Sequence, residues 1–273
     1  MLNLRILSML GAGLLAASPV LGQAPAESVD APSQLPLLVW EDATGAATAP
    51  WRCSSDDWTQ VAIGAGAVLG TALLLDRPIQ RSLQRHDSSS LHHLADHIAP
   101  IGNEYSFIVA AGFYAAGYLN HDSEAQAAGA DAFSSLLVAT VALVPLKYGF
   151  GRATPNDGLG SDSFKPLSSR DSFPSGHTTW AFTAAAAFTE HYSEPWVQVT
   201  AYGLAGLVGL ARLEQNQHWT SDVVAGALLG TTIGKVVTRL NQHKRFGQHD
   251  QVRFSLEPEL GMGYQGIRMA LKF

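Results

Sequence analysis

The stretch FPSGHTTWAFTAAAAFTEHY, residues 173–192, joins a helix start to a long run of small apolar residues. The run from Thr178 onward predicts a helix, which places Ser175, Gly176 and His177 in or next to its first turn. The free backbone N–H groups and the positive dipole end of a helix attract anions. A Ser-Gly pair before a helix is also typical of ordinary capping. The stretch therefore predicts a helix, and it raises the hypothesis that His177 faces an anion.

Further apolar segments with helical character occur along the chain, separated by polar or Gly/Pro-bearing stretches. Together with Thr178–Tyr192 they are Trp58–Leu75, Tyr105–Leu119, Ala132–Leu146, Trp196–Arg212 and Asp222–Leu240, with a weaker amphipathic segment at Leu91–Ile98. This pattern predicts an all-α fold, a six-helix bundle over residues 51–245. Several segments are rich in Gly and Ala, which lets helix backbones approach closely and is favoured inside membranes.

The composition favours a bundle that lies partly in lipid. The chain of 273 residues is 47% hydrophobic but only 15% charged, whereas an average soluble domain has about 25% charged residues. The apolar segments are close to the shortest length that crosses a bilayer. We therefore favour a membrane-embedded bundle over a soluble periplasmic one. The formal charge of −6 and the lack of a Lys/Arg stripe exclude a typical nucleic-acid-binding protein.

The N-terminal region has the layout of an exported protein. Residues 1–22 combine an early Arg5, an apolar middle and small residues near the end, which predicts a secretory signal peptide. Residues 23–50 are rich in Ala, Pro, Ser and Asp without periodicity, which predicts a flexible leader. Cys53 is the single cysteine, so an intrachain disulfide and a cysteine-based zinc site are excluded.

The C-terminal tail, residues 246–273, changes to an alternating pattern. Val252, Phe254 and Leu256 alternate with polar residues, and a similar alternation ends at Phe273. A period of two predicts two or three short strands. A terminal Phe after such a strand resembles outer-membrane barrels, but so few strands cannot close a barrel. We expect a short β segment that packs on the bundle.

Two other places in the chain carry residues suited to chemistry. His218 and Asp222 are four residues apart, so on a helix they share one face, and the carboxylate could fix the tautomer of the imidazole. The same spacing is also typical of a helix-start hydrogen bond. Lys147 and Arg152 end an apolar segment, where cations commonly interact with the helix dipole. Fixed cations of this kind could equally converge on a phosphate.

The order and spacing of these pieces resemble the three-part signature of the type-2 phosphatidic acid phosphatase and vanadium haloperoxidase superfamily. Its second part, Pro-Ser-Gly-His, is met in full by residues 174–177. Its third part is met by Arg212, His218 and Asp222, with Ala211 where the family usually has Ser.

The first part of the signature, a Lys followed after six residues by Arg-Pro, is met incompletely. Lys147 and Pro155 fit, but Thr154 stands where the family has Arg. Arg152 lies two residues earlier, and we expect it to reach the same phosphate from a shifted loop.

The resemblance implies the acid phosphatase/haloperoxidase type of helical bundle and a metal-independent phosphatase with a phosphohistidine intermediate. His218 would attack phosphorus, Asp222 would hold its ring, and His177 would protonate the leaving oxygen and later act as a base. The phosphate oxygens would be held by Lys147, Arg152, Ser175, Gly176 and Arg212. The resemblance implies no cofactor, apart from vanadate if the pocket serves a haloperoxidase.

The implied substrate is a phosphorylated lipid reached from the periplasmic side of a membrane, or else a small soluble phosphomonoester. Examples of such lipids are phosphatidic acid, phosphatidylglycerol phosphate, a polyprenyl pyrophosphate and a lipid A phosphate. Two alternatives stay open on the sequence alone. The same pocket could hold vanadate in a haloperoxidase, or the chain could be a non-catalytic envelope protein, as the departure at Thr154 suggests.

Overall fold

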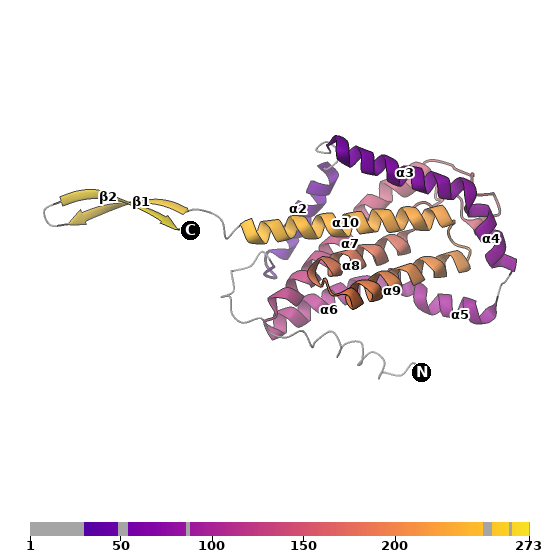
Figure 1. Cartoon of the computed structure of the whole chain (residues 1–273), viewed down its shortest axis with the longest axis horizontal. Coiled ribbons are helices and arrows are strands. Elements are labelled where there is room, and N and C mark those ends of the chain that lie inside the picture. Colours follow the sequence, from indigo (N-terminus) through magenta and orange to yellow (C-terminus); the bar gives the residue numbers. More distant parts are fainter. Residues whose placement is uncertain (1–29, 49–53, 86–87, 248–252, 262–263, 273) are drawn as a thin grey trace.

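The predicted helices form a bundle in the computed structural model, which describes residues 30–48, 54–85, 88–247, 253–261 and 264–272 (Figure 1). The six predicted apolar segments correspond to α3 (Ser55–Leu74), α6 (Glu104–Asn120), α7 (Ser123–Phe150), α8 (Gly176–His191), α9 (Pro195–Glu214) and α10 (Thr220–Gly247). The weaker amphipathic segment corresponds to α5 (Ser89–Ile98). The all-α fold class is therefore confirmed, while the predicted signal peptide lies outside the described residues.

Two helices and two short 3-10 helices lie where the sequence analysis expected none. The helices are α2 (Leu35–Thr48) and α4 (Asp76–Arg85), and the 3-10 helices are η2 (Ala99–Gly102) and η3 (Pro155–Asp157). The prediction of a flexible leader is thus wrong for α2, which packs against α7. The polar stretch that follows the first apolar segment, beginning with Asp76-Arg77-Pro78, was expected only to separate two segments, but it forms α4.

Helix α8 lies at the centre of the bundle, in contact with α6, α7, α9, α10 and η2. Its closest neighbour is α10, since a Cβ added to Gly226, Gly230 or Gly234 of α10 would fall within 2.7 Å of a backbone oxygen of α8 or of Ser175 just before it. These glycines are spaced one helical turn apart and let the two backbones touch. Figure 1 shows α7, α8, α9 and α10 running side by side. Close contact along this pair fixes the start of α10 against the start of α8.

Strands β1 (Arg253–Gly261) and β2 (Tyr264–Lys272) follow in the C-terminal tail. They pair antiparallel, with Arg253 opposite Lys272 and Gly261 opposite Tyr264. The packing of this segment on the bundle stays a prediction.

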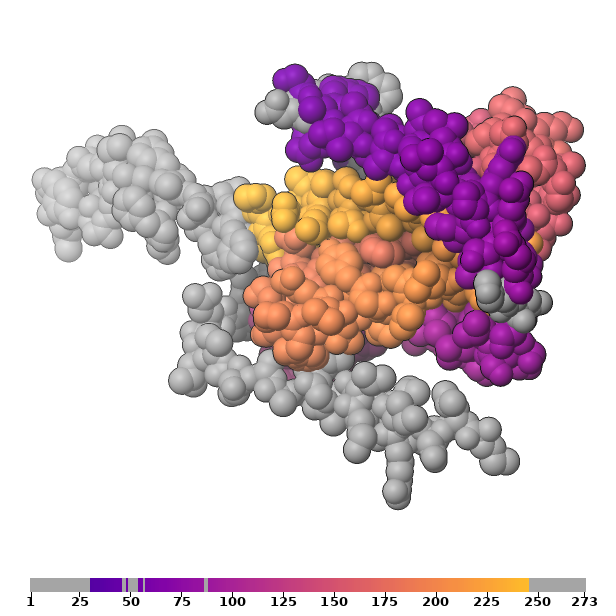
Figure 2. All heavy atoms as spheres, turned by 45° about the vertical axis from the view of Figure 1, so that its right-hand side comes forward, coloured from indigo at the N-terminus to yellow at the C-terminus, as the bar shows by residue number. Residues whose placement is uncertain are grey.

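The outer faces of the bundle carry many large apolar side chains. Examples that are more than half exposed are Leu69 and Leu73 on α3, Ile108 and Leu119 on α6, Val141 and Tyr148 on α7, and Val199 and Leu210 on α9. Helices α7 and α10 are long and apolar enough to cross a membrane, and α3 with α4 gives a third candidate if this pair, bent by 50°, counts as one span. In the view of Figure 2, α3, α10 and α9 form the surface one beneath another. The molecule thus presents apolar surface around the bundle.

Candidate active site

The predicted site residues meet at one end of the bundle, where α7 and α9 end and α8 and α10 begin. Lys147 lies in the last turn of α7, His177 in the first turn of α8 and Arg212 in the last turn of α9. His218 lies two residues before the start of α10. The backbone N–H of Ser175 donates to the carbonyl oxygen of Asp222 over 3.1 Å. This bond ties the second part of the signature to the third.

The ring of His218 is buried and held in one tautomer. Its Nδ1 lies 2.8 Å from the carbonyl oxygen of Ser172. Because a carbonyl can only accept, Nδ1 carries the hydrogen and Nε2 keeps its lone pair. Burial lowers the pKa of His218 despite the nearby Asp222, so the ring stays neutral. A neutral imidazole with a free Nε2 is the form that a nucleophile requires.

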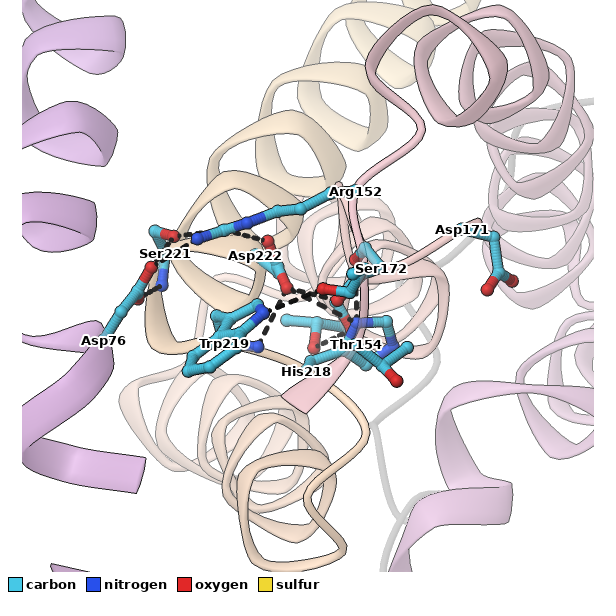
Figure 3. A network of polar contacts seen from close by, with 12 residues as sticks. Asp76, Arg152, Thr154, Asp171, Ser172, His218, Trp219, Ser221 and Asp222 are labelled. Atoms are coloured by element: carbon cyan, nitrogen blue, oxygen red, sulfur yellow. Dashed lines mark hydrogen bonds and ion pairs between the residues drawn. The ribbon is translucent and has the colours of Figure 1, made fainter. Parts of the chain in front are cut away.

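Asp222 does not bond directly to this ring, which corrects the prediction. Its Oδ2 lies 3.9 Å from Nδ1 of His218, beyond hydrogen-bond range. The carboxylate instead accepts from the Ser172 hydroxyl over 2.6 Å and from the Trp219 N–H over 2.8 Å, as Figure 3 shows. Asp222 therefore orients His218 through Ser172, whose carbonyl oxygen holds the ring.

Arg152 is a structural residue and not a phosphate ligand, which is a second correction. Its side chain is 2% exposed. Its guanidinium donates to Asp76 over 2.6 Å, to Asp222 over 2.5 Å, to Ser221 over 2.7 Å and to the carbonyl oxygen of Ser161 from both Nε and Nη2. These bonds use all five N–H groups of an arginine. No donor is left for a phosphate.

Thr154, at the position of the family arginine, has a local structural role. Its backbone N–H and its hydroxyl both donate to the carboxylate of Asp157, over 2.7 and 3.0 Å. This arrangement caps η3. Neither residue of the pair Arg152 and Thr154 therefore supplies the guanidinium that the family places here.

Two cations remain next to the start of α8. Lys147 Nζ donates to the carbonyl oxygen of Asp171 and lies 3.5 Å from its carboxylate. The same Nζ lies 4.0 Å from where a Cβ on Gly176 would be, so the amine is beside the first turn of α8. Arg212 donates from Nη1 to Gln215 over 2.7 Å, while its buried Nε has no partner among the described residues. Arg212 also lines an open hollow of about 330 Å³.

The first turn of α8 is free to bind an anion. Within the part of the chain that the structure describes, no side-chain capping hydrogen bond forms at this helix start, although Ser175 stands at the N-cap position. The Ser175 hydroxyl lies 2.9 Å from the Thr178 hydroxyl instead. The N–H groups of the first turn are thus left without a side-chain partner, as expected for an anion site.

His177 lies among these positive groups. Burial, followed by the charges of Arg212, His218 and Lys147, lowers the pKa of His177 to about 4. The ring is neutral at pH 7 in the free protein, and a bound anion would favour its protonated form. The structure therefore brings together both histidines, Lys147, Arg212 and the start of α8.

Sequence reasoning missed three residues that hold this arrangement in place. Asp76 accepts from Arg152 and from Ser221, and its side chain is fully buried. Ser221 bridges Asp76 and Arg152, and Ser172 bridges Asp222 and His218 (Figure 3). The available signals were weak: Asp76 follows an apolar segment directly, and Ser172 adjoins the Phe-Pro-Ser-Gly-His motif.

Comparisons with known proteins agree with this geometry. A model of the PAP2 superfamily matches residues 128–246. The lipid A 1-phosphatase of Porphyromonas gingivalis is 39% identical over 92 residues, which are 33% of this chain and 18% of that protein. The lipid A 1-phosphatase of Rhizobium johnstonii is 31% identical over 181 residues, which are 60% of this chain and 72% of that protein. The chain thus spans less than a fifth of the first relative and almost three quarters of the other.

A solved structure has a similar fold. It is the transmembrane PAP2 type phosphatidylglycerolphosphate phosphatase from Bacillus subtilis, with a TM-score of 0.51 and 19% identity. The match covers 77% of this chain and 96% of that one. At this level of identity the likeness concerns the fold alone.

Proposed function

Because the chain belongs to the PAP2 superfamily, we propose that it is a phosphatase that works through a phosphohistidine at His218. The observation that carries this proposal is the hydrogen bond from Nδ1 of His218 to the Ser172 carbonyl oxygen, 2.8 Å long. This bond directs the lone pair to Nε2 in a site that also contains His177, two cations and an uncapped helix start. These are the parts that nucleophilic phosphoryl transfer requires.

The reaction has two steps. In the first, Nε2 of His218 attacks phosphorus, the bond from phosphorus to the leaving oxygen breaks, and His177 gives that oxygen a proton. In the second, His177 takes a proton from water, the water oxygen attacks phosphorus, and the N–P bond breaks to release phosphate. His177 is neutral in the free protein, so the negative charge of the bound phosphate has to favour its protonated form.

The positive charge for this chemistry comes from the chain itself in our proposal. Lys147 and Arg212 would hold the non-bridging oxygens together with the N–H of Gly176 and the Ser175 hydroxyl. Arg152 takes no part, since its donors are used. We therefore propose a metal-independent reaction, and a chelator should leave the rate unchanged.

We propose a membrane lipid phosphate as the substrate. The relatives are named as phosphatases of lipid A and of phosphatidylglycerolphosphate, and the bundle presents apolar side chains on its outer faces. Both lipids join a phosphate to apolar chains that stay in the bilayer. We further propose that the segment 1–22 directs export and that the site faces the periplasm.

The test is phosphate release by the purified, detergent-solubilised protein from lipid A, phosphatidylglycerol phosphate, phosphatidic acid and p-nitrophenyl phosphate. His218→Asn and His177→Asn should each lower kcat by at least about 1000-fold, because each removes a group that takes part in bond making or breaking. His121→Asn is the matched control, since His121 ends α6 in a left-handed conformation that Asn tolerates. It should keep wild-type activity.

A second readout tests the intermediate. Brief incubation with a radiolabelled substrate should leave acid-labile phosphate on the wild-type protein and none on His218→Asn. Release of no phosphate from any of the four substrates would contradict the proposal. Bromide oxidation that depends on vanadate and peroxide would favour the haloperoxidase alternative instead.

A further inference from the structure

A glutamine and an aspartate outside the signature hold the phosphate-binding arginine in place. We propose that Gln215 and Asp96 are positioning residues, which orient Arg212 so that one edge of its guanidinium stays free for the phosphate. This inference rests on the proposed function, and it concerns residues to which the signature gives no role.

The geometry is a chain of two hydrogen bonds from α5 to α9. Arg212 donates from Nη1 to Oε1 of Gln215 over 2.7 Å. Gln215 donates from Nε2 to Oδ1 of Asp96 over 2.7 Å. Because the carboxylate can only accept, it fixes the nitrogen of the amide on its own side. The amide oxygen must then face Arg212, and the guanidinium is held by that oxygen.

The bond to Gln215 leaves the opposite edge of the guanidinium available. Nε of Arg212 is buried and has no hydrogen-bond partner among the described residues. A buried unpaired donor is costly, so a site that keeps one is suited to an anion that binds there. Nε and Nη2 form the edge that binds phosphate through two parallel N–H groups.

The side-chain amide of Gln215 is neutral, so it does not compensate the positive charge of Arg212. A guanidinium paired directly with carboxylates, as Arg152 is with Asp76 and Asp222, has its charge compensated before a phosphate arrives. Gln215 holds Arg212 without adding a negative charge, and it keeps the carboxylate of Asp96 one residue further away. No carboxylate of the described residues is hydrogen-bonded to Arg212, and only the charge of Asp171 acts on it from a distance, so Arg212 is compensated less than Arg152.

The loop that contains Gln215 is fixed from several sides. Asn216, in a left-handed conformation with φ of 56°, donates to Asn156 over 2.8 Å and accepts from Gln80 of α4 over 3.2 Å. The N–H of Gln217 donates to the carbonyl oxygen of Arg212 over 3.1 Å. The short loop between Arg212 and His218 is thus tied to α4, to α5 and to the loop before α8. Because this loop is fixed, the hydrogen bond between Gln215 and Arg212 also fixes the position of the Arg212 guanidinium at the phosphate site.

The test compares kcat, KM and the inhibition constant for vanadate with a soluble phosphomonoester as substrate. Gln215→Leu should raise both KM and the vanadate inhibition constant about tenfold, because it removes the acceptor that orients Arg212. Gln215→Glu should raise them further, since its carboxylate would pair with Arg212 and compete with the oxyanion. A merely structural role would predict the reverse order, because a glutamate preserves the bond to Arg212.

Two aspartate variants and one control complete the series. Asp96→Asn can donate to Gln215 as well as accept from it, so it fixes the amide less firmly, and both constants should lie between those of wild type and Gln215→Leu, whereas Asp96→Leu should resemble Gln215→Leu. Gln198→Leu is the matched control on the same helix, since Gln198 is exposed and bonds to the Ser193 carbonyl oxygen far from the site. Its kinetics should be unchanged.

Vanadate protection against thermal unfolding separates the two proposals. If wild type turns over substrate and Gln215→Leu matches it in KM and vanadate inhibition, the positioning role is wrong and the phosphatase proposal stands. If wild type shows no turnover but vanadate stabilises it less after Gln215→Leu, the phosphatase proposal fails and the positioning role stands. If vanadate stabilises neither protein and neither turns over substrate, both are wrong.

Discussion

Two arginines near the site have different bonding partners, and this difference gives one a structural role and leaves the other able to bind phosphate. Arg152 is buried between the carboxylates of Asp76 and Asp222, while Arg212 is held by the neutral amide of Gln215 and keeps an unpaired Nε. The charge of the first is compensated inside the protein. The charge of the second is available to a ligand.

Replacing Arg152 should therefore affect stability more than phosphate binding. Arg152→Met leaves two buried carboxylates without their partner, and breaking a buried ion pair in this way costs about 3–5 kcal/mol. We expect a clearly lower melting temperature in detergent. Arg77→Met is the control, because Arg77 pairs with Asp162 at the surface, where such a pair contributes at most about 1 kcal/mol. A stable Arg152→Met protein with only a raised KM would restore Arg152 as a phosphate ligand.

His177 should make stability depend on pH. Its pKa is lowered to about 4 in the folded protein, from an ordinary value of 6.5, first by burial and then by Arg212. The unfolded chain binds the proton more readily, so stability is highest above pH 6.5 and falls as the pH drops toward 4. The shift corresponds to at most about 3 kcal/mol.

The measurement compares wild type with His177→Gln by thermal unfolding at pH 7 and pH 4.5. The stability of the variant relative to wild type should increase at the lower pH, because the variant has no imidazole to protonate. Saturating vanadate at pH 7 should stabilise wild type, since the anion compensates the positive groups around His177. An equal pH dependence of the two proteins would show that His177 is not held among cations.

The sequence could predict which residues meet but not what each of them bonds to. His177 and His218 lie at helix starts and Lys147 and Arg212 near helix ends. Apolar periodicity predicted the helices, and the resemblance to the family signature implied that these residues share one site. One partner of Arg152 is Asp76, which lies 76 residues earlier in the chain. The other contacts of Arg152 depend on the path of the loop before α8. Such contacts follow from tertiary structure, so spacing along the chain does not reveal them.

At the scale of helices, α2 shows that ion pairs can order a segment that has little helical signal. Arg245 of α10 binds both carboxylate oxygens of Asp30 just before α2, and it also binds both oxygens of Asp131 in α7. Asp42 of α2 accepts from Ser134 over 2.6 Å and from Asn241 over 2.9 Å. This polar cluster attaches α2 to α7 and α10.

Removing Arg245 should release α2 from the bundle. Arg245→Met leaves Asp30 without its cation, while Asp131 keeps His191 and Asn241 as partners. The cost of the unpaired, buried carboxylate of Asp30 favours detachment of the helix. Limited proteolysis should then cut before or within α2 at least about tenfold faster than in wild type, as expected when local opening becomes easier. Arg239→Met is the matched control on the same helix, because Arg239 pairs with Glu190 at the surface. Equal cutting rates in all three proteins would mean that other contacts hold α2.

The helices that bury apolar side chains were predicted correctly, whereas α2 and α4, which bury polar side chains, were missed. The six long segments were recognisable because their apolar runs exceed the length of a strand. Helix α2 contains Gly, Thr and a Pro, and α4 is polar and begins with Asp76. Both are held by carboxylates that pair with distant cations, and a periodicity argument does not detect such pairing.

At the scale of the whole molecule, a location in a membrane explains both the low content of charged residues and the exposed apolar side chains. Only 15% of the residues are charged, and α3, α6, α7, α9 and α10 all expose large apolar side chains. A surface of this kind in water would favour aggregation. We therefore expect the protein to stay in the membrane fraction after a high-salt wash and to be released by detergent. Release by salt alone would favour the soluble alternative.

The two ends of α8 should lie on opposite sides of that membrane. The loop of residues 151–175 precedes α8 at the site, and residues 192–194 follow it at the other end. In a Cys53→Ser background, Leu159→Cys and Ser193→Cys place single thiols at these two ends, and both native side chains are exposed. A maleimide that cannot cross the inner membrane should label Leu159→Cys in cells with a permeabilised outer membrane. It should label Ser193→Cys only after the cells are lysed. Labelling of both would indicate a soluble protein, and labelling of Ser193→Cys alone would place the site on the cytoplasmic side.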